Sequence, residues 1–185
     1  MSEPLSYSLV AKRLRLPLGF ALAILYLIFA RPTRAGLTVG AAIALVGLLM
    51  RAWASGHIHK NAALATSGPY AHTRNPLYFG SFLIGAGFAI AAHWSLLLLV
   101  IAFFVLVYAP TIERERANIL GRFPETYPDY ERNVPTFFPR PTPWRAPIAE
   151  SGAFSFELYM KHGEWKAALG YILAVAWLVF HLVDR

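Results

Sequence analysis

Long apolar runs alternate with polar stretches along the chain. Each run is close to the roughly 17–25 residues that a helix needs to cross a bilayer. The runs cover about Leu16–Ala30, Leu37–Ala54, Leu77–Ala92, Ser95–Thr111 and Trp165–Val183. This pattern predicts an all-α, polytopic membrane protein with about five transmembrane helices. We expect one integral-membrane domain over residues 1–185.

Short connections and small residues predict how the helices pack. Ala91-Ala92-His93-Trp94 is the only break between the third and fourth runs, so these two should form a tight antiparallel hairpin. Glycines recur in the second and third runs, which predicts close helix packing through small residues. They include Gly40, Gly47, Gly80, Gly85 and Gly87.

Two polar stretches interrupt the apolar pattern, Gly68–Tyr78 and Glu113–Arg140. The first part of the second stretch, up to Arg122, is expected to continue the fourth helix beyond the bilayer. Pro124 and Pro128 should then interrupt further regular helix. A chain of bilayer-length runs does not need two such stretches merely to connect helices. They therefore indicate a cofactor site at a membrane surface.

Composition supports the membrane assignment and excludes several other classes. The chain is 57% hydrophobic and only 15% charged, which is too little charge for a soluble domain of 185 residues. Its net charge of +7 does not indicate nucleic-acid binding, because the basic residues flank apolar runs instead of forming one stripe. Because cysteine is absent, the chain has no disulfide, thiolate nucleophile or lipidation site.

The distribution of Lys and Arg predicts the orientation. With the N-terminus in the cytoplasm, 14 of the 17 basic residues lie inside, and only Arg31, Arg34 and Arg185 lie outside. The positive-inside rule favours this arrangement, which also puts both polar stretches in the same compartment. We expect an integral protein of a bacterial inner membrane with a cytoplasmic site.

Arg74, Asn75 and Pro76 mark the start of the third apolar run. Proline favours the first turn of a helix, and Asn75 is a plausible N-cap. One interpretation is a helix cap beside an arginine that binds lipid headgroups. The other is an anion site, because a helix N-terminus with an adjacent arginine suits a carboxylate.

Further polar residues allow two interpretations each. Glu113 and Glu115, at the end of the fourth run, are either solvated charges or ligands of a cation. Tyr70, Tyr78, Tyr127 and Tyr130 are either interfacial tyrosines or an aromatic wall of the site. His57, His59 and His72 are not expected to bind metal, because no carboxylate or cysteine lies nearby.

The two polar stretches resemble the isoprenylcysteine carboxyl methyltransferase family and the related phospholipid methyltransferases. The motifs are GPYAHTRNPLY and, after a hydrophobic hairpin, ERERANILGRFPETYPDYERNVP, within about residues 51–140. The resemblance implies S-adenosylmethionine as cofactor and a lipophilic or lipid acceptor at the membrane. It implies cofactor-binding positions at Leu64, Ala65, Tyr70, Arg74, Asn75, Pro76, Tyr78 and Glu115. No catalytic residue or metal ligand is assigned.

Departures from the family pattern concern the substrate. Asn75 stands where the family usually has histidine, and asparagine cannot become cationic. Thr111 stands where eukaryotic members carry an arginine for the substrate carboxylate, four residues before Glu115. Arg116 and Pro124 replace a second glutamate and a glycine. The resemblance therefore implies methyl transfer more directly than a prenylcysteine substrate.

Other functions of the same fold stay open. The first alternative is a phospholipid or small-molecule N-, O- or S-methyltransferase. The second is a non-catalytic membrane scaffold or carrier, which the residues Asn75 and Thr111 favour. A membrane reductase is disfavoured by the short chain and by the missing phosphate-binding cluster. Neither the acceptor nor the oligomeric state follows from the sequence.

Overall fold

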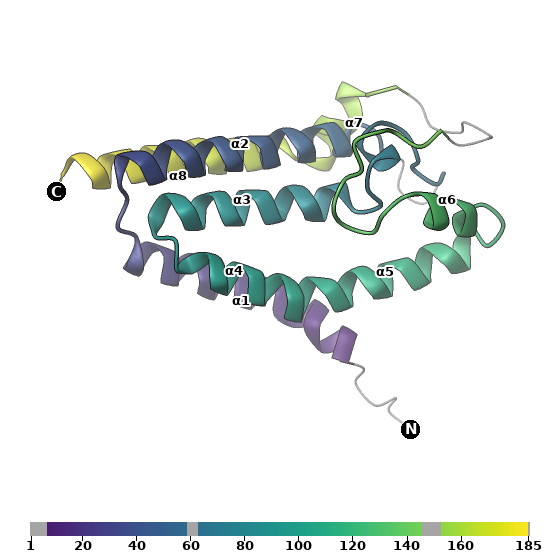
Figure 1. The fold of residues 1–185 in the computed structure, drawn as a ribbon, viewed down its shortest axis with the longest axis horizontal. Coiled ribbons are helices and arrows are strands. Elements are labelled where there is room, and N and C mark those ends of the chain that lie inside the picture. The colour runs from purple at the N-terminus through teal and green to yellow at the C-terminus, as the bar shows by residue number, and fades with distance from the viewer. Residues whose placement is uncertain (1–6, 59–62, 146–152, 185) are drawn as a thin grey trace.

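The computed structural model describes residues 7–58, 63–145 and 153–184, and all of the secondary structure in these ranges is helical (Figure 1). The predicted all-α class is therefore confirmed. In chain order the elements are α1 (Tyr7–Phe29), α2 (Arg34–Ser55), the 3₁₀ turn η1 (Gly68–Ala71), α3 (Pro76–Ala92), α4 (Leu96–Phe103), the π-helical turn η2 (Phe104–Tyr108), α5 (Ala109–Arg122), α6 (Tyr127–Asn133), α7 (Phe156–His162) and α8 (Trp165–Val183).

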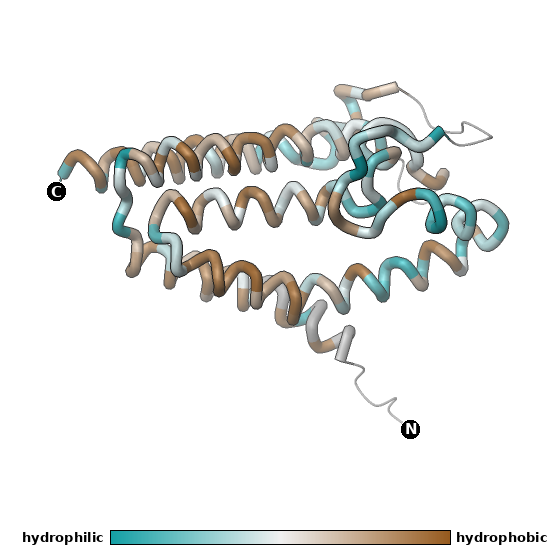
Figure 2. Tube along the Cα trace, viewed as in Figure 1, coloured by the Kyte–Doolittle hydropathy of each residue, from teal (hydrophilic) through white to brown (hydrophobic). Residues whose placement is uncertain are grey.

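Apolar helices make up one elongated part of the molecule. Three of them are long and apolar enough to cross a membrane, Arg34–Ser55, Leu96–Arg122 and Trp165–Val183. Two shorter apolar helices, Pro17–Phe29 and Pro76–Ala92, complete the predicted set of five. Hydrophilic residues gather at the end formed by α5, α6 and the neighbouring loops (Figure 2). Many large apolar side chains on the helices are exposed, which is expected of surfaces that face lipid.

Helices α2 and α3 lie against each other through glycines, as the sequence predicts. A Cβ atom added at Gly40 would lie 2.3 Å from the backbone oxygen of Gly87. One added at Gly47 would lie 2.5 Å from the backbone oxygen of Gly80. Because any side chain at these positions would collide with backbone, the helix pair depends on glycine.

The predicted hairpin between the third and fourth apolar helices is present, since α3 ends at Ala92 and α4 begins at Leu96. Its turn is held to the connection before α2, because the backbone amide of Arg31 donates to the carbonyl of Ala92 at 2.9 Å. Nearby, buried apolar residues from several helices form a core cluster. It consists of Ala30, Ala89, Ala91, Ala92, Leu96 and Leu178.

The helices extend beyond the predicted apolar runs. Helix α1 begins at Tyr7 instead of Leu16 and contains Pro17. The apolar run marks only the part suited to the bilayer, whereas Lys and Arg before it are good helix formers and allow the helix to extend. The fourth helix does continue to Arg122, as predicted, but through the π-helical turn η2. Pro128 does not prevent helix, because it lies in the first turn of α6, where proline is tolerated.

Candidate functional site

The two polar stretches are joined by backbone hydrogen bonds. The amide of Arg74 donates to the carbonyl of Pro135, the amide of Arg140 to that of His72, and the amide of Trp144 to that of Ala71, each at 2.9 Å. The hydroxyl of the fully buried Thr73 donates to the carbonyl of Phe137 at 2.9 Å. The sequence prediction that both stretches build one region is therefore confirmed.

Two of the three histidines in this region have structural contacts. Nδ1 of His57 lies 2.9 Å from the carbonyl oxygen of Trp53, and Nδ1 of His72 lies 2.8 Å from that of Arg140. The His57 ring lies so close to Gly68, whose φ is +56°, that no side chain fits there. His59 lies outside the described residues. No group of three potential metal ligands occurs in the ranges that the structure describes.

A polar cavity of about 370 Å³ opens between the loop before α3, helix α5 and helix α6. Six of the eight predicted cofactor-binding residues line it: Leu64, Ala65, Tyr70, Arg74, Asn75 and Glu115. Tyr127 and Tyr130 of the predicted aromatic wall also line it. The structure thus brings together residues that lie far apart in the sequence.

Pro76 and Tyr78 do not line the cavity but support it. Pro76 is buried in the first turn of α3. The hydroxyl of Tyr78 donates to Oε1 of Glu115 at 2.7 Å, so Tyr78 holds this carboxylate at the cavity wall. The ring of Tyr78 also meets the ring of Tyr108 edge to face, with centroids 5.3 Å apart.

Tyr70 presents a buried hydroxyl. Its side chain is only 6% exposed, and the hydroxyl has no hydrogen-bond partner within the described ranges. Burial raises the pKa of Tyr70 above its ordinary value, with a further contribution from Glu164, so the phenol keeps its proton. Tyr130 fixes the loop, because its hydroxyl donates to the backbone oxygen of Tyr70 at 2.8 Å. Tyr70 is therefore a ready donor beside the cavity.

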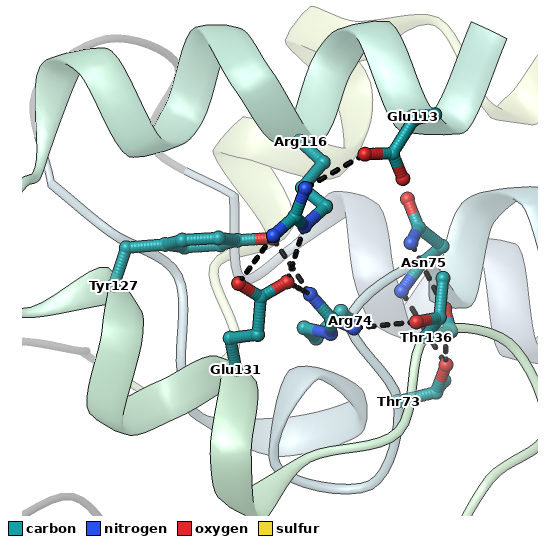
Figure 3. Close-up of polar contacts among 8 residues, drawn as sticks. All are labelled: Thr73, Arg74, Asn75, Glu113, Arg116, Tyr127, Glu131 and Thr136. Atoms are coloured by element: carbon teal, nitrogen blue, oxygen red, sulfur yellow. Dashed lines mark hydrogen bonds and ion pairs between the residues drawn. The ribbon is translucent and has the colours of Figure 1, made fainter. Parts of the chain in front are cut away.

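The guanidinium of Arg74, a predicted cofactor-binding group, already has partners within the protein, which the sequence did not predict. Its guanidinium donates to the hydroxyl of Tyr127 at 2.9 Å, to Glu131 and to the hydroxyl of Thr136 (Figure 3). Only Nε is buried without a partner among the described residues. These partners come from the tertiary structure, because α6 places the carboxylate of Glu131 and the phenol of Tyr127 against the loop before α3.

Asn75 occupies the N-cap position of α3, as predicted, but its side chain makes no capping hydrogen bond. Its Nδ2 instead donates to the backbone oxygen of Thr136 at 2.9 Å. Pro76 at the first helical position has no N–H, which leaves fewer donors for a cap. Asn75 therefore joins the two polar stretches instead of closing the helix end.

Sequence reasoning missed the contribution of helix α5. Residues before and after Glu115 on the same side of α5 also line the cavity, and a projection along the helix from Glu115 would have found most of them. They are Ile112, Arg116, Ile119 and Arg122, with Asn118 beside them. Glu113 lies on the exposed side of α5 and is not part of the cavity lining. Its carboxylate accepts a hydrogen bond from Nη1 of Arg116 at 2.7 Å.

A second ion pair lies near the same end of the bundle. Arg51 of α2 donates from Nε and Nη2 to the two carboxylate oxygens of Glu164, at 2.9 and 2.6 Å. Nη1 of Arg51 also donates to the hydroxyl of Ser81 at 2.5 Å. Because Glu164 precedes α8, this fork ties α2, α3 and α8 together.

An apolar cavity, also of about 370 Å³, lies between the helices. It is lined by residues of α1, α3, α4 and η2, among them Tyr26, Ser81, Gly85, Phe88, Val100 and Tyr108. The hydroxyl of Tyr26 is buried and unpaired within the described part of the chain. Tyr108 lines this cavity, and Tyr78 joins it to Glu115 of the polar cavity. These two tyrosines thus stand between the cavities.

Comparison with known families identifies the central part of the chain. Residues 37–123 match the family described as phospholipid methyltransferase. The matched region contains most of α2 and all of α3, α4 and α5, together with Tyr70, Arg74 and Glu115. The family resemblance inferred from the motifs is confirmed for this region.

Two curated relatives carry metal-resistance names. The chain is 37% identical over 109 residues to the nickel-cobalt-cadmium resistance protein NccN of Alcaligenes xylosoxydans xylosoxydans, covering 56% of this chain and 50% of the relative. It is 36% identical over 106 residues to the cobalt-zinc-cadmium resistance protein CzcN of Cupriavidus metallidurans, covering 55% and 47%. The chain spans about half the length of these relatives. No solved structure matches significantly.

Proposed function

We propose that the phospholipid methyltransferase domain at residues 37–123 binds S-adenosylmethionine in the polar cavity and methylates a lipophilic acceptor. The observation that carries the proposal is the cavity itself. It combines a carboxylate, guanidinium groups and a buried, unpaired phenol with apolar side chains, all of which the matched family region supplies. Its volume of about 370 Å³ lies in the usual range for small-molecule sites.

The cavity residues fit a nucleoside that carries an amino-acid end. The hydroxyl of Tyr70 and Nε of Arg74 are buried donors without partners among the described residues, and a bound ligand would satisfy them. Glu115 would hold an ammonium group, and Arg74 with Arg116 would hold a carboxylate. Tyr127, Tyr130 and the apolar side chains of α5 would pack against the adenosine part.

The protein has little covalent chemistry to perform. When bound, S-adenosylmethionine supplies a sulfonium methyl that is already activated. The chain's part is then to align the reactants and exclude water. Tyr78 keeps Glu115 oriented by its 2.7 Å hydrogen bond, and the protonated Tyr70 can donate but not act as a base.

The apolar cavity supports a hydrocarbon-bearing acceptor. It lies between membrane-type helices, it is next to the Tyr78–Tyr108 pair, and the hydroxyls of Tyr26 and Ser81 are among its few polar groups. We therefore place the chain of the acceptor there, with its reactive head directed at the polar cavity. Thr111 lines neither cavity, and its buried hydroxyl donates to the carbonyl of Val107 at 2.7 Å. This disfavours a prenylcysteine carboxylate and favours phospholipid or other lipid acceptors.

The proposal is tested by binding and by transfer. Isothermal titration of the purified protein in detergent with S-adenosylhomocysteine should give saturable binding. Radiolabelled S-adenosylmethionine should then label a component of a bacterial lipid extract and label N-acetyl-farnesylcysteine poorly. Absence of both binding and labelling would favour a non-catalytic membrane protein of the same fold.

Filling the apolar cavity should block the acceptor without affecting the cofactor site. Gly85 lines this cavity, and a Cβ there would lie 3.2 Å from Cγ1 of Val100, so Gly85→Leu is expected to occupy the space. Lipid methylation should fall about tenfold or more, because a single misplaced contact costs on that order. S-adenosylhomocysteine affinity should stay unchanged. Gly170→Leu is the control, since nothing lies within 4 Å of that site. Normal lipid methylation by Gly85→Leu would show that the acceptor does not bind in the apolar cavity.

We further propose that the polar cavity faces the cytoplasm in a bacterial inner membrane. The proposal rests on the basic residues, 14 of 17 of which then lie inside. The chain lacks cysteine, so single cysteines report topology directly. In right-side-out vesicles, an impermeant maleimide should label Asp184→Cys and spare Thr142→Cys. Labelling of Thr142→Cys and not of Asp184→Cys would show that the topology is the opposite of the proposed one.

A further inference from the structure

We infer that Glu131 determines which ligands the polar cavity accepts, because its carboxylate occupies two cavity arginines and must release one before a ligand carboxylate can bind. The inference rests on the proposed function, since the ligand carboxylate is that of S-adenosylmethionine or S-adenosylhomocysteine. It concerns a residue that lies within the second sequence motif but to which the family resemblance assigned no role.

Glu131 stands between two guanidinium groups from different elements (Figure 3). Nε of Arg116 donates to its Oε1 at 2.5 Å and Nη2 of Arg116 to its Oε2 at 3.0 Å. Nη1 of Arg74 also donates to Oε1. Both arginines line the polar cavity, whereas Glu131 does not. A single carboxylate from α6 therefore holds two of the arginines that line the cavity.

The charges of these side chains distinguish ligands that carry a carboxylate from ligands that lack one. Arg74 and Arg116 carry two positive charges, and Glu131 and Glu113 carry two negative ones. Hydrogen bonds from Arg116, and then from Arg74, lower the pKa of Glu131, so its carboxylate stays ionised at neutral pH. An incoming carboxylate consequently finds both Arg74 and Arg116 already paired with carboxylates until one of these pairs is exchanged.

Exchange is feasible because Glu131 is not sealed off from water. Its side chain is 21% exposed, so a released carboxylate can be hydrated, whereas the side chain of Arg74 is only 11% exposed. Binding of a ligand carboxylate would replace Glu131 on one arginine and leave it on the other. Ligands without a carboxylate would bind without any exchange.

The test compares two ligands that differ in the amino-acid end. S-adenosylhomocysteine carries the carboxylate, and 5′-methylthioadenosine keeps the nucleoside and thioether but lacks it. Glu131→Gln should bind S-adenosylhomocysteine about three- to tenfold more tightly by isothermal titration in detergent, because the competing charge is gone. Its affinity for 5′-methylthioadenosine should stay within about twofold of wild type.

Glu113→Gln is the matched control. Glu113 bonds the same Arg116, but it is 66% exposed, is not itself a lining residue and has no bond to Arg74, so both affinities should stay close to those of wild type. Weaker or unchanged binding of S-adenosylhomocysteine by Glu131→Gln would overturn the inference. Equal weakening of both ligands would also overturn it and would assign Glu131 a purely structural role.

A second variant tests the inference if Glu131→Gln does not fold. In Arg116→Gln the carboxylate of Glu131 keeps only Arg74, so exchange becomes harder and S-adenosylhomocysteine should bind about tenfold more weakly than to wild type. Unaltered affinity in Arg116→Gln would contradict the inference. If wild type binds neither nucleoside, the proposed cofactor site itself fails. If wild type binds both and only the Glu131 effect is missing, the inference alone fails.

Discussion

Glu115→Gln should weaken binding of S-adenosylhomocysteine by about ten- to hundred-fold. Glu115 lines the polar cavity and is oriented by the hydroxyl of Tyr78 at 2.7 Å. In the proposed complex it pairs with the ligand ammonium, and a hydrogen bond to a charged group contributes about 1.5–3 kcal/mol. Isothermal titration in detergent measures the change directly. Because glutamine keeps the shape of the side chain, the loss would reflect charge and not packing.

Two further measurements make the Glu115 result specific. Binding of 5′-methylthioadenosine, which has no ammonium group, should be nearly unaffected. Glu113→Gln, two residues earlier on the exposed side of α5, should bind S-adenosylhomocysteine like wild type. If Glu115→Gln binds S-adenosylhomocysteine with wild-type affinity, Glu115 has no part in the site.

Gly40→Val should destabilise the whole protein. An added Cβ atom at Gly40 would lie 2.3 Å from the backbone oxygen of Gly87 and 2.5 Å from the backbone nitrogen of Ala91, so α2 and α3 would have to separate. Overpacking of this kind costs roughly 3 kcal/mol or more, which corresponds to a fall in melting temperature of about 10 °C. Thermal unfolding followed by tryptophan fluorescence in detergent would measure it.

Gly170→Val provides the matched comparison for Gly40→Val. Both glycines lie inside apolar helices, but nothing lies within 4 Å of a Cβ at Gly170. The helix-propensity cost of valine is therefore shared, and only Gly40→Val adds a collision. Equal melting temperatures for the two variants would show that the α2–α3 contact is looser than the structure indicates.

Much of the fold could be predicted because its signals are local. Bilayer-length apolar runs predict helices wherever they occur, since only backbone groups bonded within the segment are stable in lipid. The hairpin between α3 and α4 and the position of Pro76 in the first turn of α3 follow from a few neighbouring residues. The boundaries of α1 were less predictable, because charged residues that favour helix carry no apolar signal.

The candidate site was predictable only in part. Family motifs indicated Tyr70, Arg74 and Glu115, and these residues do line one cavity. They assigned no role to Glu131, which pairs with Arg74 across 57 positions of sequence. Nor did they indicate that Tyr78 lies behind Glu115 instead of in the lining. Such partners depend on which helices meet, and no periodicity within a single segment encodes that.

The sequence by itself determined the class of the protein and the regions that carry polar chemistry. Hydrophobic burial in a bilayer depends on run length and composition, which can be read directly along the chain. Tertiary structure decided the ionic pairing. In the fold, Arg74 and Arg116 pair with one carboxylate of α6. Arg51 pairs with Glu164 across 113 positions of sequence. Tyr78 and Tyr108 lie between the two cavities. Electrostatic and packing partners are chosen by distance in space, so only the folded helices could specify them.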